Sequence, residues 1–74
     1  MIIIHQTVDY HPSYFGIEVK ASTTLHGNDV RGLQALATAA GKHWLRGVVL
    51  YTGTEVVPFA ANLHGVPLSR LWSE

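Results

Sequence analysis

The hydrophobic positions of the chain follow two different periods. Residues 15–22 alternate between apolar and polar side chains, which is the period of a β-strand. The apolar members, which we expect to face a core, are Ile17, Val19 and Ala21. The opposite face then carries Glu18 and Lys20, a carboxylate and an ammonium group two residues apart. Such an E-x-K pair is often only a solvated ion pair, so its meaning depends on what flanks it.

A helical period follows between residues 28 and 41. Apolar side chains recur three or four residues apart and form one stripe, made of Val30, Leu33, Leu36, Ala37 and Ala40. Asn28 is a suitable N-cap, Asp29 falls in the first turn, and Gly41 is the expected C-terminal glycine. The pattern predicts an amphipathic helix of about three turns that lies on a sheet.

Further strands are indicated before and after this helix. Residues 2–10 are rich in β-branched and aromatic side chains and predict a first strand, followed by a turn at residues 11–14 that contains Pro12. Residues 46–51 form a near-continuous apolar run, which is typical of a strand buried on both faces. Because the helix separates this strand from the one at residues 15–22, the two should be parallel and joined by a right-handed crossover.

The remaining residues predict shorter elements. An antiparallel arm is expected at residues 55–59, and Pro58 marks it as a sheet edge. Residues 62–67 are expected to form a loop with at most one short strand, and residues 69–72 a short helix with Trp72 over the core. The predicted fold class is therefore α/β (α+β), with a small mixed sheet of four to five strands, one β-α-β crossover helix and a short C-terminal helix.

The first hairpin decides which polar groups meet. If residues 11–14 are its loop, Asp9 lies opposite Gly16, on a diagonal of about 7–8 Å from Glu18. This register gathers Asp9, Glu18 and Lys20 on one face of the sheet. A slip of one residue would send Asp9 to the other face and separate the three groups.

Length and composition limit the classes of function. A chain of 74 residues forms one small domain, and the lack of cysteine excludes disulfides and thiolate metal sites. Only 14% of the residues are charged, below the usual quarter, so apolar surface is left over for association. The formal net charge is zero, so the chain lacks the excess of basic residues that is typical of nucleic-acid-binding proteins. No apolar run is long enough to span a bilayer and no secretory signal is evident, so the expected location is the cytoplasm.

Four segments of the chain together resemble one protein family: Gly16–Ser22, Asp29–Leu33, Gly47–Gly53 and Val66–Trp72. In this order they are similar to the DUF4143-like domain of unknown function that follows AAA+ ATPase modules in prokaryotes. The resemblance implies a restriction-endonuclease-like fold of the PD-(D/E)xK type. Residues 1–14 match the family poorly, so we expect residues 1–74 to be a single partial nuclease-like domain, a truncated stand-alone form of it.

The resemblance also implies a set of site residues. In nucleases of that superfamily, two acids on neighbouring strands bind a divalent ion, usually Mg²⁺, and the lysine of E-x-K steadies the attacking water or the developing charge. Carried over to this chain, Asp9 and Glu18 would be metal ligands, and Lys20 would be the third catalytic residue. Oxygen ligands suit Mg²⁺, and a metal-bound water beside a cation suits attack on a phosphodiester. The G-x-x-x-x-G-K-[ST] motif is absent, so no ATP hydrolysis is expected of this sequence.

Two functions stay open at this point. The first is a non-catalytic interaction module, or remnant of an AAA+ ATPase-associated protein, that pairs through a sheet edge or apolar surface as a homo-oligomer or with a partner protein. The alternative is a Mg²⁺-dependent nuclease that acts on DNA or RNA through Asp9, Glu18 and Lys20. The low charge and small size favour the first, and no membrane partner is expected.

Overall fold

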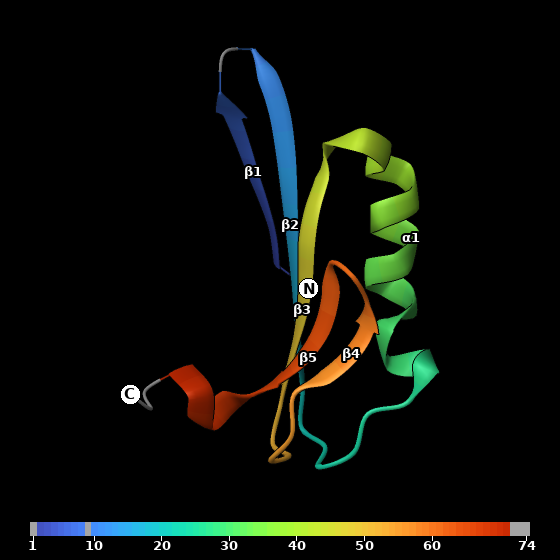
Figure 1. The fold of residues 1–74 in the computed structure, drawn as a ribbon, viewed down its shortest axis with the longest axis vertical. Helices are drawn as coiled ribbons and strands as arrows, with labels where there is room; N and C mark the ends of the chain where they lie inside the picture. Colours follow the sequence, from blue (N-terminus) through green and yellow to red (C-terminus); the bar gives the residue numbers. More distant parts are fainter. Residues whose placement is uncertain (1, 9, 72–74) are drawn as a thin grey trace.

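Five strands form one mixed sheet in the order β1-β2-β3-β5-β4 (Figure 1). The computed structural model describes residues 2–8 and 10–71. The strands are β1 (Ile2–Val8), β2 (His11–Lys20), β3 (Trp44–Tyr51), β4 (Val57–Ala60) and β5 (Leu63–Pro67). β2, β3 and β5 are parallel neighbours, whereas β1 and β4 pair antiparallel at the two edges. The mixed α/β architecture predicted from the sequence is confirmed.

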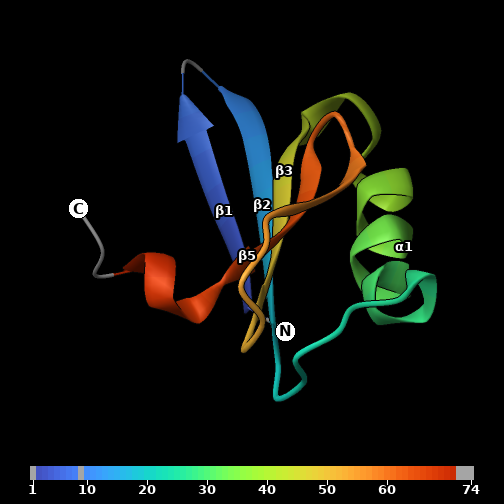
Figure 2. The same cartoon turned by 60° about the horizontal axis from the view of Figure 1, so that its bottom comes forward.

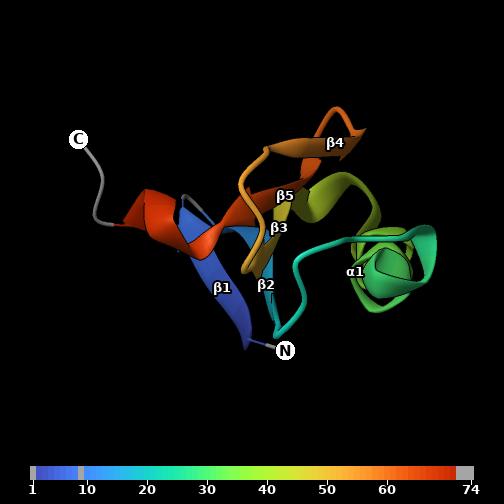
Figure 3. The ribbon, with the colours of Figure 1, turned by 90° about the horizontal axis from the view of Figure 1, so that it is seen from below.

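A helical crossover connects β2 to β3 over one face of the sheet (Figures 1 and 3). It consists of the 3₁₀ turn η1 (Gly27–Val30), helix α1 (Arg31–Ala40) and the 3₁₀ turn η2 (Gly41–His43). Gly41 ends α1 with a φ of 56°, as its predicted role requires. The predicted N-cap at Asn28 is wrong, because Asn28 lies inside η1 and the capping position is His26. The backbone N–H of His26 donates to Oδ2 of Asp29 at 2.8 Å.

The core lies between α1 and a face of the sheet that is rich in glycine. Its buried side chains are Val30, Leu33, Trp44, Val49 and Leu63. A Cβ atom at Gly16 would lie 2.5 Å from Cδ2 of Leu33, and one at Gly47 would lie 2.7 Å from Cδ1 of Leu63. The glycines therefore let large side chains pack directly on the backbone of β2 and β3.

The face of β2 that packs against α1 is the opposite of the one predicted. Gly16 is buried beneath α1, whereas Ile17 is half-buried and Val19 is 57% exposed. A period of two determines which residues share a face, but not which face is covered. Gly16 and Gly47 face α1 because a side chain at either position would occupy the space of the Trp44 indole ring.

β3 is likewise buried on one face rather than on both. Gly47, Val49 and Tyr51 are buried, while Val48 and Leu50, which point the other way, are half-buried. The apolar run at residues 46–51 therefore does not correspond to a strand covered on both faces.

The first hairpin turns earlier than predicted. Val8 pairs with His11 and Ile2 with Ile17, so the predicted loop at residues 11–14 is wrong and those residues belong to β2. Tyr10 lies in the turn and has a positive φ of 65°. Pro12 is tolerated in β2 because β3 begins only opposite Tyr14, which leaves Pro12 with a strand on one side.

Residues 62–67, predicted to be mainly loop, contain the interior strand β5. The antiparallel arm after β3 pairs with β5, and its register shifts between Pro58 and Ala60. Pro58 does mark an edge of the sheet, as predicted. The chain continues into the 3₁₀ turn η3 (Leu68–Leu71) on the side of the sheet opposite α1 (Figures 1 and 3). Trp72, predicted to cover the core, lies outside the described residues.

Across residues 2–8 and 10–71, no helix combines the length and the apolar character that crossing a membrane would require.

Candidate functional site

The three parallel strands end together in one row of residues. Lys20 is in register with Tyr51, and Tyr51 with Pro67. The row two residues earlier aligns Glu18 with Val49 and, through it, with Gly65. Both rows lie on the same face of the pleat as Gly16 and Gly47, the face that α1 covers. In α/β sheets this carboxyl end of the strands is the usual place for ligands, so Glu18 and Lys20 occupy a position suited to a site.

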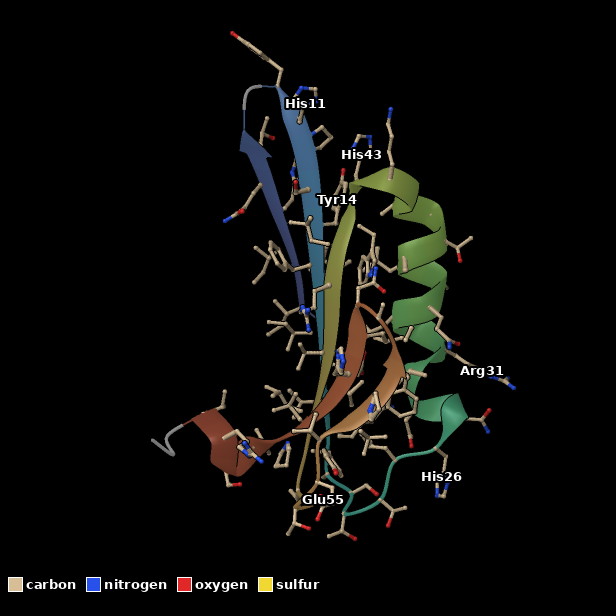
Figure 4. The ribbon with its side chains drawn as sticks, viewed as in Figure 1. His11, Tyr14, His26, Arg31, His43 and Glu55 are labelled. Atoms are coloured by element: carbon tan, nitrogen blue, oxygen red, sulfur yellow. The ribbon has the colours of Figure 1, made fainter. Side chains whose placement is uncertain are left out.

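The loops at this end are held together by hydrogen bonds. The backbone N–H of Thr52 donates to the carbonyl of Ser22 at 3.0 Å, which joins the loop after β2 to the loop after β3. The buried Tyr51 donates its hydroxyl to the carbonyl of Glu55 within the second loop. Glu55 and His26 lie at this end of the molecule (Figure 4). The surroundings of Glu18 and Lys20 are therefore built from two loops and the start of the crossover.

The described residues of β1 do not lie beside Glu18. β1 begins opposite Ile17, so its described residues do not flank Glu18 or Lys20. Val8 pairs with His11, seven residues before Glu18, which corresponds to roughly 23 Å along a strand. The hairpin register predicted for residues 2–15 is therefore wrong. Asp9 itself lies outside the described residues, and the set of Asp9, Glu18 and Lys20 stays a prediction.

Metal ligands do not gather elsewhere in the described chain. Among residues 2–8 and 10–71, no three histidine, aspartate or glutamate side chains lie close enough together to hold an ion. The carboxylate of Asp29 already accepts the N–H of His26 at the start of η1.

A surface pocket that the sequence did not predict lies at the C-terminal end of α1, away from Glu18 and Lys20. This cavity of about 290 Å³ is lined by Tyr14, Leu36, Ala39, Ala40 and His43. The ring of His5 stacks on that of Tyr14, with centroids 4.8 Å apart and planes 12° from parallel. Tyr14 and His43 can be followed in Figure 4. The stack depends on the hairpin register, because His5 and Tyr14 pair across β1 and β2, so a turn predicted at Tyr10 would have indicated it.

The sheet face opposite α1, which we call the open face, is apolar over most of its area. By the alternation of paired strands, its apolar positions are Ile2, Ile4, Phe15, Ile17, Val19, Val48, Leu50 and Val66. It also carries Arg46 and His64, whose Nη1 and Nδ1 atoms are 3.3 Å apart. None of its described strand positions is acidic.

These features define a small α/β domain in which a mixed sheet is covered on one face by a crossover helix. A comparison with known protein families matches residues 7–71 to a domain of unknown function (DUF4143). The chain belongs to this family, and the predicted resemblance to a DUF4143-like domain is confirmed. The match includes all of β2 to η3 and begins near the end of β1. No curated protein and no solved structure matched the chain.

Proposed function

We propose that this domain is a non-catalytic interaction module whose open face binds an amphipathic helix of a partner protein. The observation that carries the proposal is the unequal covering of the sheet, with α1 on one face and aliphatic side chains on the other. Parallel strands are normally covered on both faces by helices, because their side chains are apolar on both sides. A helix from a second protein, such as an ATPase, would supply the missing layer.

The dimensions of the domain agree with an incomplete layer structure. Its radius of gyration is 12.7 Å, whereas a compact domain of this length has a value of about 11 Å. Val19 on the open face is 57% exposed, and Leu71 in the adjoining η3 is 60% exposed. Burial of one such aliphatic side chain contributes roughly 1.5–3 kcal/mol, so a few of them suffice for moderate affinity.

The charges of the open face favour one kind of helix. Arg46 places a guanidinium group among the aliphatic residues, and no described strand position of the open face is acidic. A helix with glutamates beside its leucines therefore complements this face better than one with lysines. Since an exposed ion pair contributes at most about 1 kcal/mol, the charge selects the partner while the apolar contact drives binding.

The proposal is tested with two model helices that share one leucine pattern and differ only in glutamate or lysine at the polar positions. Amide resonances of the full chain are followed during titration with each peptide. We expect shifts at Val19, Leu50 and Val66, tighter binding of the glutamate peptide, and loss of that preference in Arg46→Gln. Shifts confined to the outer surface of α1, at Gln34 and Thr38, or equal affinity for both peptides would contradict the proposal.

A second candidate is a Mg²⁺-dependent nuclease on a restriction-endonuclease-like fold. It is supported by the placement of Glu18 and Lys20 two residues apart on one face of β2, at the carboxyl end of the parallel strands. In this candidate Glu18 and Asp9 bind the ion, and Lys20 stabilises the charge that develops on the phosphate.

Mn²⁺ distinguishes this candidate from the first. Because Mn²⁺ is paramagnetic, binding at the predicted site would broaden the amide signals of Glu18 and Lys20 at millimolar metal, and Glu18→Gln would abolish the effect. Cleavage of DNA or RNA should then need both Mg²⁺ and Lys20, with Lys42→Ala as a matched lysine control. If Mn²⁺ left the amide signal of Glu18 unchanged, the nuclease candidate would be excluded and the interaction module would be the remaining function.

A further inference from the structure

The two edges of the sheet differ in how they are protected. β4, at one edge, has four residues, contains Pro58 and has an irregular register with β5. Short length, proline and bulges are the devices by which proteins prevent edge-to-edge pairing. β4 is therefore a protected edge.

β1, at the other edge, has none of these features. It is seven residues long, IIIHQTV, and contains no proline, lysine, arginine, aspartate or glutamate. Its pairing with β2 runs through seven consecutive residue pairs without a register shift. No strand lies on its outer side in the described part of the chain, and it stands at the end of the sheet farthest from α1 (Figures 2 and 3). Its outward backbone groups are therefore free to pair with another strand.

The side chains of β1 add apolar surface to this free edge. Ile2, Ile3 and Ile4 are 57%, 53% and 41% exposed. Ile2 and Ile4 belong to the open face, and Ile3 lies on the other face, opposite Gly16. A strand laid beside β1 would therefore bury aliphatic surface on both sides of the sheet.

We infer that β1 pairs antiparallel with β1 of a second copy of this chain, which joins two five-stranded sheets into one sheet of ten strands. A two-fold axis through the edge requires the antiparallel direction, because each copy must present the same residues to the other. A strand without lysine, arginine, aspartate or glutamate pairs with itself without placing such like charges opposite one another. A heterologous strand with charges on it would gain nothing from this composition.

The protected edge at β4 explains why such an assembly closes at two copies. If both edges were free, head-to-tail pairing would continue into a filament. Pro58 and the irregular β4–β5 register prevent growth from the far edge, so the assembly ends with the β1 pair. This inference concerns the edge of the sheet, whereas the proposed function concerns its open face, so each can fail without the other.

Sedimentation of the full chain over a wide range of concentrations tests the inference. We expect a reversible dimer of twice 8.1 kDa and no larger species. Ile3→Lys, which places a charge in the strand pair, should raise the dissociation constant about tenfold or more. Val19→Lys, an equally exposed position on the open face, is the matched control and should leave the dimer unchanged.

Each other outcome overturns the inference. A monomer at every concentration, growth beyond the dimer, or dissociation by Val19→Lys would each show that β1 is not the self-pairing edge. Circular dichroism checks that both variants are folded.

Amide hydrogen exchange of the unmodified chain supplies a test that needs no variant. Protection in β1 should rise with protein concentration while protection in β4 stays constant, and equal behaviour of the two strands would overturn the inference.

Discussion

The two faces of the sheet are built from different residues, although they share the same strands. On β3, the α1 side carries Gly47, Val49 and Tyr51, all buried, while the open face carries Val48 and Leu50, both half-buried. The glycines remove side chains where α1 and Trp44 approach, so the packing there is close and specific to this chain. The open face keeps its aliphatic side chains and so offers surface to another molecule. The covered face thus accounts for folding, whereas the aliphatic side chains of the open face are partly exposed.

The largest expected effect comes from removing a leucine that packs between α1 and the sheet. Leu33 is 1% exposed beneath the sheet, whereas Leu45 is 45% exposed. Leu33→Ala should lower the free energy of unfolding by about 2–5 kcal/mol, because it leaves a cavity that α1 cannot fill. Leu45→Ala should cost less than about 1 kcal/mol. Urea denaturation of both variants measures the difference, and equal midpoints would contradict the core assigned to Leu33.

A smaller difference is expected from adding one methyl group to a glycine. A Cβ at Gly47 would lie 2.8 Å from Cζ2 of Trp44, whereas a Cβ at Gly27 would meet no described atom within 4 Å. Gly47→Ala should therefore destabilise the protein by about 1–3 kcal/mol through overpacking. Gly27→Ala should be neutral or stabilise it by up to about 1 kcal/mol, because it restricts the unfolded chain. Thermal unfolding followed by circular dichroism compares the two, and a neutral Gly47→Ala would mean that Trp44 can move aside.

Much of the fold could be predicted because the spacing of apolar residues and the residues that end helices or form turns are local properties of a sequence. The stripe from Val30 to Ala40, the stop at Gly41 and the parallel pairing of β2 with β3 all follow from neighbouring residues. The covered face of β2 could not be predicted in this way, since it depends on glycines brought together from separate strands. Gly16 aligns with Gly47 only after β2 and β3 have paired.

The candidate site was harder to predict than the fold because it depends on register. Pro12 favours a turn, but it lies in β2 where only β1 is beside it. In the observed register His5 pairs with Tyr14 and stacks on its ring, with 4.8 Å between the ring centroids. That Glu18 and Lys20 share one face could be predicted without knowing the register, because side chains alternate along a single strand.

The last comparison separates the two faces most directly, because the same substitution is made on both. Val49 is fully buried against α1 and Val19 is 57% exposed on the open face. Replacement by threonine keeps the shape and adds a hydroxyl group, which costs about 1–3 kcal/mol where no partner can accept its hydrogen bond. Val49→Thr should show this loss in urea denaturation, whereas Val19→Thr should change the unfolding free energy by no more than about 0.5 kcal/mol. Val19→Thr should nevertheless weaken binding of the glutamate model helix, since part of its contact becomes polar. If Val19→Thr destabilised the chain as much as Val49→Thr, the open face would be part of the folding core and not a surface kept for a partner.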